Sequence, residues 1–302
     1  MDWVSYTEWN GGAAHSVVGT VMVYPELASP QLGNQRHILV YLPPSYETRG
    51  TDYPVVYMHD GQNLFDKHTS GHGEWCADET MEALAAEGIE AILVGIPHRG
   101  EQRVHELSPY VCPQSGSLGL GAQYTGFIAN EVKRLIDRSF RTLRGPSHTG
   151  IMGSSMGGLI SLHACLREPE TFGLCGAMSP ALWFGNYAIL DEVRTARHFP
   201  IRLYMDSGRS EIGTARRSAS LSTRAYARRA QDLCGESPPF ESSRLSALWV
   251  EDVRSLHQLL ETYAKRQTQL MYVETPSEHN EAAWSRRFPD AIRFLLEQTL
   301  DG

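Results

Sequence analysis

The most constraining feature of this 302-residue sequence is a serine among glycines between a predicted strand and a predicted helix. The stretch Gly153–Gly158 follows a predicted short buried strand at 147–152 and precedes a helical pattern at 159–167. A strand that enters a sharp turn and opens a helix exposes the central side chain, Ser155, at the tip of that turn. The flanking glycines let strand and helix approach closely, and the free N–H groups of the helix N-terminus favour negative charge there. A plain Gly/Ser loop is the alternative interpretation.

Short apolar, β-branched segments alternate with helical patterns from about residue 53 onward. This alternation predicts an α/β fold with a mostly parallel sheet covered by helices on both faces. No helical pattern separates the first two strands, so we expect them to form an antiparallel hairpin at the sheet edge. The predicted strands are Gly19–Tyr24, Arg36–Leu42, Val55–His59, Ala91–Ile96, Gly150–Met152, Leu174–Ser179, Ile201–Asp206 and Gln269–Glu274. The predicted helices are Asp78–Ala86, Tyr124–Phe140, Leu159–Arg167, Phe288–Leu300 and a further helix near Leu245–Arg266.

The chain contains no internal repeat and no low-complexity linker, which predicts a single domain over residues 1–302. Two segments interrupt the alternation. Residues 99–123 are rich in Gly, Ser and Pro and predict a long loop near the strand ends. Residues 209–266 are longer than one crossover requires and carry many arginines, which predicts a cap or lid insertion. A solvated amphipathic helix is the alternative for this second segment.

Composition narrows the possible partners and the compartment. The formal charge of −8 argues against nucleic acid or an anionic membrane as the main partner. No apolar run approaches the roughly 20 residues that a membrane span needs, and the first residues show no signal-peptide pattern. Five cysteines without CxxC spacing predict reduced thiols and a cytoplasmic protein.

An exposed serine becomes a strong nucleophile only when a base accepts its proton. The best of the twelve histidines is His279, between the last predicted strand and the last predicted helix, with His59, His98 and His163 as weaker candidates. A carboxylate should orient the imidazole, in the chain order Ser, acid, His. Glu211 is favoured because it lies in the loop beyond a strand. Asp206, predicted at the end of that strand, is the alternative acid, and Asp252 is a distant third.

Negative charge that develops on a substrate oxygen needs two backbone donors. We expect one from the N–H of Met156, directly after the serine, and one from Gln62, in the turn after the strand Val55–His59. A simple turn at the end of that strand is the alternative. This chemistry requires no cofactor and no metal. The spacing of His68, His72 and Glu74 does not indicate a metal site, because the adjacent glycines disfavour a helix there.

Several segments, in order along the chain, resemble the "putative esterase" branch of the α/β hydrolases, which includes enterochelin, feruloyl and acetylxylan esterases, S-formylglutathione hydrolases and mycolyltransferases. The matching segments are Leu39–Tyr46, Tyr53–Gln62, Gly153–Gly158, Asp206–Glu211 and Glu278–Trp284 with the following Arg287-Phe288-Pro289. The resemblance implies an α/β-hydrolase fold, with Ser155 as nucleophile, His279 as base and the position of Glu211 as acid. The segment 213–248 departs from short family members, and residues 3–24 match nothing diagnostic.

The expected function is therefore hydrolysis of a small-molecule carboxylic ester through an acyl-enzyme on Ser155. An acyltransferase that uses the same acyl-enzyme is one alternative, and a catalytically inactive binding protein on the same fold is another. Aromatic residues near the predicted loops, Trp183, Phe184 and Phe65, are candidates for the wall of the substrate pocket. The sequence identifies neither the ester nor the oligomeric state.

Overall fold

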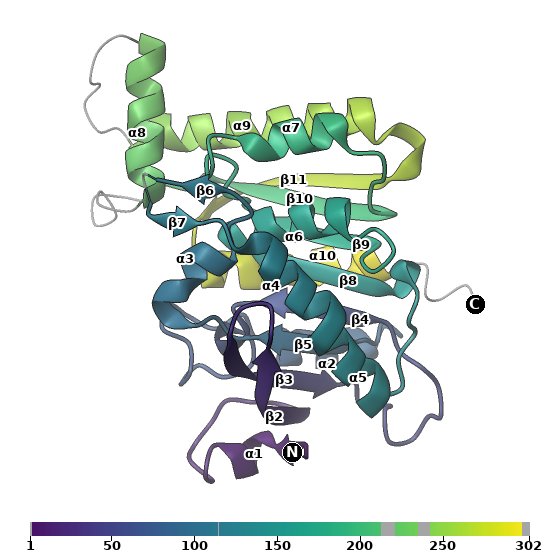
Figure 1. The fold of residues 1–302 in the computed structure, drawn as a ribbon. Coiled ribbons are helices and arrows are strands. Elements are labelled where there is room, and N and C mark those ends of the chain that lie inside the picture. Colours follow the sequence, from purple (N-terminus) through teal and green to yellow (C-terminus); the bar gives the residue numbers. More distant parts are fainter. Residues whose placement is uncertain (1, 114, 213–220, 235–241, 298–302) are drawn as a thin grey trace.

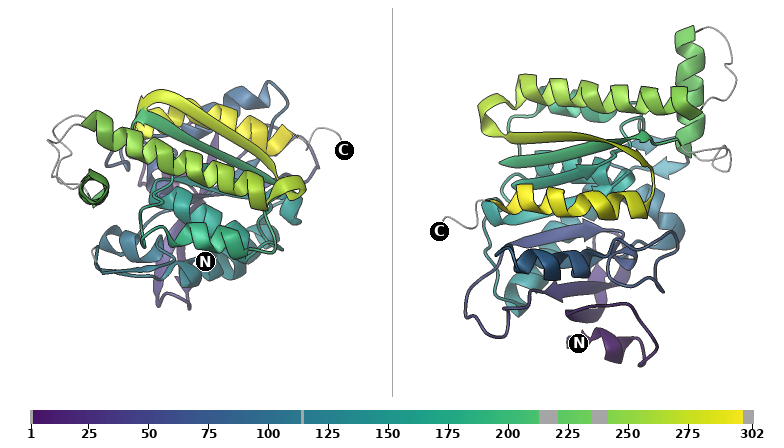
Figure 2. Two further views of the ribbon diagram at one scale, coloured as in Figure 1. Left: turned by 90° about the horizontal axis from the view of Figure 1, so that it is seen from above. Right: turned by 180° about the vertical axis from the view of Figure 1, so that it is seen from behind.

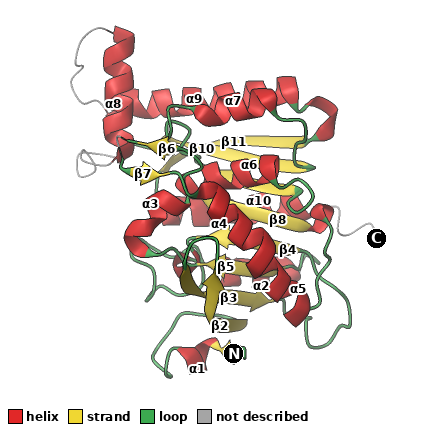
Figure 3. Cartoon of the chain, viewed as in Figure 1, coloured by secondary structure: helices red, strands yellow, loops and turns green. Residues whose placement is uncertain are grey.

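The computed structural model describes residues 2–113, 115–212, 221–234 and 242–297. Within these residues nine strands form one mixed sheet in the order β1-β2-β3-β5-β4-β8-β9-β10-β11 (Figures 1 and 3). A separate two-stranded ribbon is formed by β6 and β7. The strands are β1 Val4–Ser5, β2 Thr20–Ser29, β3 Asn34–Leu42, β4 Val55–His59, β5 Ile92–Ile96, β6 Val111–Cys112, β7 Ser117–Leu118, β8 Thr149–Ser154, β9 Leu174–Met178, β10 Arg202–Ser210 and β11 Gln269–Glu278.

The strand directions confirm the predicted sheet. β1 pairs antiparallel with β2, β2 with β3, and β3 with β5. From β5 to β11 every neighbouring pair is parallel. The hairpin at the N-terminal edge and the mostly parallel sheet are therefore both present as expected.

Helices cover both faces of the sheet, and side chains of each strand alternate between two cores. In β4, Val55 and Tyr57 enter the core with α6 and α9, whereas Val56 and Met58 enter the core with α2 and α10. Figure 2 shows α10 in front in the view from behind, on the face opposite α9. The helices are α1 Tyr6–Trp9, α2 Ala77–Ala85, α3 Arg103–Glu106, α4 Gly121–Phe127, α5 Lys133–Ser139, α6 Met156–Arg167, α7 Ala188–Thr195, α8 Leu221–Cys234, α9 Ser242–Tyr263 and α10 Glu281–Leu296, with a π-helical turn η3 at Ile128–Val132 and short 3-10 turns η1 Gly61–Asn63, η2 Gly100–Gln102, η4 Pro146–His148 and η6 Lys265–Gln267.

Several boundaries differ from the predicted ones. β10 continues to Ser210 and β11 to Glu278, because the two strands pair with each other beyond the apolar residues that marked them in the sequence. α10 begins at Glu281 and not at Phe288, since the Asn280 side chain accepts the N–H of Ala283 and caps the helix seven residues earlier.

The first of the two irregular segments contains more structure than expected, and in the second the helix predicted near Leu245–Arg266 is present as α9. Residues 99–123 hold η2, α3, β6, β7 and the start of α4, so the prediction of one long loop was wrong. These elements are too short for a periodic pattern, and a buried ion pair between Arg36 of β3 and Glu106 of α3 fastens them to the sheet. In the second segment, α9 packs on β10 and α7 as a crossover helix, and α8 packs on α9. The predicted cap role of 209–266 stays a prediction; 213–220 and 235–241 lie outside the described residues.

Candidate active site

Five predicted or newly found site residues follow the carboxyl ends of five neighbouring parallel strands. Gln62 follows β4, Ser155 follows β8, Ser179 follows β9, Glu211 follows β10 and His279 follows β11. These strands are consecutive in the sheet, so their carboxyl ends form one continuous edge (Figure 1). In open α/β sheets this edge is where binding crevices are built.

Ser155 has the backbone of a strained turn. Its φ of 57° and ψ of −117° are unfavourable for a residue with a Cβ. Two hydrogen bonds hold the turn: the Ser155 N–H donates to Met178 O at 2.9 Å, and Ala181 N–H donates to Ser155 O at 3.0 Å. α6 starts at Met156, whose N–H is among the first of the helix and has no intrahelical acceptor. A substrate oxygen placed beside Ser155 could accept this N–H.

Two of the glycines around Ser155 are required by close contacts. A Cβ on Gly153 would lie 2.9 Å from Cδ2 of His59, and one on Gly158 would lie 2.9 Å from Met178 O. Gly157 has more room, with His59 Cβ at 3.4 Å. The His59 side chain therefore packs directly against the glycines of the Ser155 turn. Its Nδ1 lies 2.9 Å from the hydroxyl of Tyr124, and burial lowers its pKa to about 4.

His279 and Glu211 meet because of the register between β10 and β11. Ser210 of β10 pairs with Glu278 of β11, after a register irregularity that starts at Gly208. Glu211 follows Ser210 and His279 follows Glu278, so both residues leave the sheet at the same point. His279 Nδ1 lies 2.5 Å from Glu211 Oε2. A carboxylate at Nδ1 leaves Nε2 as the nitrogen that can exchange a proton with a substrate or a hydroxyl.

The Glu211 carboxylate is fully enclosed and well supplied with donors. Ser179 Oγ donates to Oε1 at 2.6 Å, and the Gly208 N–H donates to the same oxygen. Burial alone would raise the pKa of Glu211, but His279 and these donors hold it below its ordinary value. The carboxyl is therefore ionised at neutral pH.

Asp206, the alternative acid of the sequence analysis, lies elsewhere. It is inside β10 and not at its end, and its register partner is Val273, six residues before His279. Its carboxylate accepts the Ser179 N–H at 2.9 Å and lies 3.0 Å from Nη1 of Arg287. Burial raises the pKa of Asp206 to about 6, against the opposing effect of Arg287. The structure thus brings Glu211, and not Asp206, to His279. Asp252, the third candidate, pairs with Arg229 and Tyr226.

Two indole rings flank the His279 imidazole. The Trp249 ring centroid lies 4.8 Å from that of His279, and the Trp284 centroid lies 4.9 Å away in an edge-on arrangement. Trp284 comes from the first turn of α10, whereas Trp249 comes from α9, inside the segment predicted as a cap. The sequence analysis missed Trp249, because nothing in a helical pattern far from His279 in sequence indicates that the two rings meet.

Gln62 lies in the 3-10 turn η1, directly after β4. Gly61 permits this turn, since a Cβ there would lie 2.5 Å from backbone atoms of Gly95 and Ile96. Asp60 before it has a φ of 55° and is held by Arg103, whose Nε and Nη2 lie 2.7 and 2.8 Å from the carboxylate. The Gln62 side chain accepts the His98 N–H at 3.2 Å. As the second residue of η1, Gln62 has no intrahelical acceptor for its N–H.

The three aromatic residues predicted to line the substrate pocket differ in their exposure to solvent. Trp183 is half-buried, whereas Phe184 and Phe65 are each 1% exposed. Phe65 packs near Tyr41 in the core that includes α2 and α10. The pocket roles of all three stay predictions, and of the three only Trp183 presents surface.

His163, a weaker candidate for the base, lies away from this edge of the sheet. Its Nδ1 lies 2.8 Å from Glu192, a pairing that keeps this ring in a buried network on α6 and α7.

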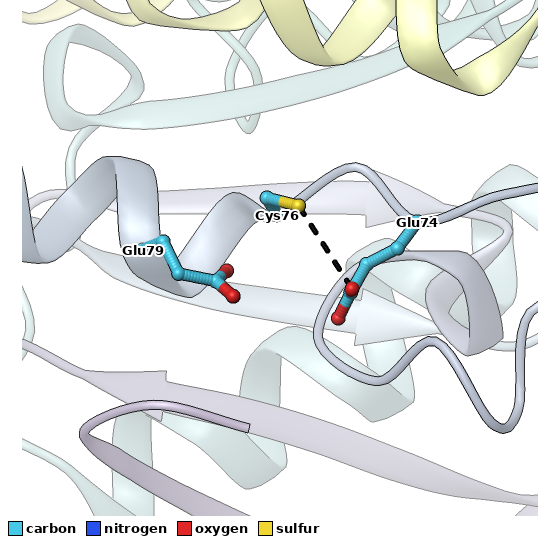
Figure 4. A group of neighbouring side chains, drawn as sticks. All are labelled: Glu74, Cys76 and Glu79. Atoms are coloured by element: carbon cyan, nitrogen blue, oxygen red, sulfur yellow. Dashed lines mark hydrogen bonds between the residues drawn. The ribbon is translucent and has the colours of Figure 1, made fainter. Parts of the chain in front are cut away.

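One group of side chains has ligand atoms close enough to hold a metal ion. Atoms of Glu74, Cys76 and Glu79 lie within 4.8 Å of one another among the described residues (Figure 4). Burial and the neighbouring carboxylates raise the pKa of the Cys76 thiol to about 11, which disfavours the thiolate that a metal would need. His68, which the sequence analysis weighed as a metal ligand, has its Nδ1 2.9 Å from Asp66 Oδ1. No helix in the described ranges is long and apolar enough to cross a membrane.

Comparison with known proteins places these features in a family. The family model described as "Putative esterase" matches residues 29–295. The chain is 32% identical over 199 residues to the uncharacterized protein YbbA of Bacillus subtilis, an alignment that covers 64% of this chain and 74% of that protein. It is 27% identical over 146 residues to the siderophore triacetylfusarinine C esterase of Aspergillus fumigatus, with 47% and 48% covered, so the match spans about half of the fungal enzyme.

The fold is shared with solved esterase structures. The siderophore hydrolase EstB of Aspergillus nidulans superposes with a TM-score of 0.69 at 19% identity, over 94% of this chain and 98% of that one. At such identity the likeness establishes the α/β architecture alone. The match over most of the sequence goes further: the chain belongs to the "Putative esterase" family and is a carboxylic ester hydrolase.

Proposed function

We propose that the protein hydrolyses carboxylic esters through an acyl-enzyme on Ser155, with His279 as general base and Glu211 as its acidic partner. The observation that carries this proposal is the contact of 2.5 Å between His279 Nδ1 and the buried, ionised Glu211. It lies on the sheet edge from which the strained Ser155 turn also emerges.

The reaction follows from these positions. Ser155 Oγ attacks the ester carbonyl carbon while His279 Nε2 takes the hydroxyl proton. The N–H groups of Met156 and Gln62 are the proposed donors to the resulting oxyanion, and loss of one such donor costs about 10²–10³ in turnover. The bond from carbon to the alcohol oxygen then breaks, and His279 returns its proton to the leaving alcohol. Water, deprotonated by His279, hydrolyses the acyl-enzyme and restores Ser155.

For the substrate, we propose a siderophore ester. The support is the match to the triacetylfusarinine C esterase of Aspergillus fumigatus and the fold shared with a siderophore hydrolase. The two indoles beside His279 are 0% and 5% exposed, so they pack around the imidazole, and among the predicted pocket residues Trp183 is the one that presents surface to a substrate.

The test combines labelling with turnover. A fluorophosphonate probe should modify the wild-type protein on the peptide that carries Ser155, as read by mass spectrometry, and leave Ser155→Ala unmodified. Hydrolysis of p-nitrophenyl acetate, butyrate and octanoate, methyl ferulate and triacetylfusarinine C is then compared for both proteins. We expect Ser155→Ala to lose at least 10³-fold in kcat/KM. Equal rates in the two proteins, or labelling at another residue, would overturn the assignment, and activity on the simple esters alone would overturn the siderophore substrate.

A further inference from the structure

Ser179 is a buried serine that none of the predicted roles includes. It follows β9 directly, is 0% exposed and has a φ of 39°, a conformation that favours glycine. Its N–H donates to Asp206 Oδ1 at 2.9 Å, which fixes the backbone. A glycine would satisfy this backbone geometry at lower cost, so the side chain must supply something that glycine lacks.

Three groups surround the Ser179 hydroxyl, and they determine where its proton points. Trp284 Nε1 lies 3.2 Å and Arg287 Nη2 lies 3.1 Å from Oγ, and both groups can only donate. The third neighbour, Glu211 Oε1 at 2.6 Å, can only accept when ionised. Two obligatory donors occupy the lone pairs of Oγ, so its single hydrogen is directed to Glu211.

This arrangement fixes the carboxylate that faces His279. Oε1 of Glu211 accepts from Ser179 Oγ at 2.6 Å, from the Gly208 N–H and, at the longer distance of 3.4 Å, from Ser207 Oγ. Oε2 is left for His279 Nδ1. Arg287, itself 5% exposed, is anchored by Asp206 at 3.0 Å and by the Ala283 carbonyl. A chain of contacts therefore runs from Asp206 through Arg287 and Ser179 to Glu211.

We propose that Ser179 is a positioning residue for the esterase reaction: its hydroxyl, oriented by Trp284 and Arg287, holds Glu211 in the one placement that directs His279. This inference rests on the proposed function of Ser155, His279 and Glu211. It also gives Asp206 a task, which is to anchor the arginine and the Ser179 backbone instead of contacting the histidine.

The first experiment is a double-mutant cycle with Glu211. We expect Ser179→Ala to lower kcat about tenfold with KM unchanged, because a hydrogen bond to an ionised group is lost. In a Glu211→Gln background the same change should cost less than about twofold, since Ser179 acts through that carboxylate. Ser179→Gly, which suits the positive φ, should show the same loss of kcat, and this variant also covers the case in which the alanine protein fails to fold.

The second readout does not depend on turnover. In protein labelled with ¹⁵N-histidine, the Nδ1–H of His279 should give a far-downfield proton resonance that disappears in Glu211→Gln. We expect Ser179→Gly to shift this resonance upfield. Ser29→Ala, which removes another buried serine hydroxyl on β2, should leave both the resonance and kcat unchanged.

The outcomes separate the two proposals. If Ser155→Ala is inactive but the losses from Ser179→Gly and Glu211→Gln multiply fully, or the resonance does not move, the role of Ser179 is overturned while the proposed function stands. If Ser155→Ala retains activity, both proposals fail together.

Discussion

His59 shows how one residue can support the site without taking part in its chemistry. It ends β4, is 3% exposed, and lies against Gly153 and Gly157 beneath the Ser155 turn. The sequence analysis treated it as a weaker candidate base. Its burial lowers its pKa to about 4, so the ring is neutral at the pH at which an esterase works. The neutral His59 ring therefore has a structural role, which is to pack against the glycines of the Ser155 turn.

This burial predicts a pH dependence of stability. The folded protein keeps His59 neutral down to about pH 4, whereas the unfolded chain binds a proton near pH 6.5. The unfolded state therefore binds more protons between these values, and stability rises with pH there. The contribution is complete above pH 6.5 and is lost as the pH falls toward 4; it amounts to about 3 kcal/mol. Urea unfolding of wild type and His59→Gln at several pH values measures this effect. The free energy of unfolding of wild type, relative to that of His59→Gln, should rise as the pH rises from about 4 to 6.5. Parallel curves would contradict the burial argument.

At the scale of elements, register decides which acid meets His279. Ser210 and Glu278 are paired, so the strands β10 and β11 deliver Glu211 and His279 to one point, whereas Asp206 stays beside Val273. The sequence showed two acids five residues apart on one segment. It could not show that β10 runs four residues beyond its predicted end at Asp206 or that the pairing is irregular after Gly208, because register depends on two strands at once.

Ion pairs between elements contribute differently to the free energy of unfolding, depending on how buried they are. Arg36 of β3 donates from Nη1 and Nη2 to Glu106 of α3 at 2.9 and 2.8 Å, with side chains 1% and 2% exposed. Arg36→Met should cost about 3–5 kcal/mol, because it leaves a buried carboxylate without its cation. The double variant with Glu106→Gln should recover most of that loss.

An exposed arginine–carboxylate pair that also has two hydrogen bonds is the control. Arg293 also donates from two nitrogens to one carboxylate, Glu87, at 2.8 and 2.7 Å, but on the surface. Arg293→Met should change the free energy of unfolding very little. Both comparisons use urea denaturation, and an equal loss in Arg36→Met and Arg293→Met would refute the dependence on burial.

At the scale of the whole molecule, the site is an edge built from distant parts of one sheet. The five residues that follow β4, β8, β9, β10 and β11 span positions 62 to 279 and come together because those strands are neighbours and parallel. Helices of both faces contribute as well, with Trp249 from α9 and Trp284 and Arg287 from α10. Every group that the proposed acyl transfer needs belongs to this chain.

This self-sufficiency predicts that metal removal has no effect on turnover. We expect dialysis against EDTA to leave kcat and KM for p-nitrophenyl butyrate unchanged. The group Glu74, Cys76 and Glu79 is the internal check (Figure 4). A loss of activity that Zn²⁺ restores in wild type but not in Cys76→Ser would contradict the prediction and assign a metal to that group.

The sequence by itself determined the class of fold and the class of reaction, which is ester hydrolysis. Alternating strand and helix patterns predicted the parallel sheet and its antiparallel edge, since apolar periodicity is a local property of the chain. The glycines and Ser155 predicted the sharp turn for the same local reason, and the confirmed family match agrees with them. The three residues proposed to carry catalysis were all named from sequence; their roles stay predictions.

Only the tertiary structure decided how the residues meet. The contact between Glu211 and His279 depends on the register of two strands that lie about 70 residues apart in sequence. The hydroxyl of Ser179 and the ring of Trp249 belong to no motif of the sequence, because a buried serine or tryptophan looks the same in sequence wherever it packs. Arg287 lies in one of the segments that resemble the family, but the resemblance gave it no role. Their significance arises from which groups surround them, and such long-range packing is settled when all elements assemble on the sheet.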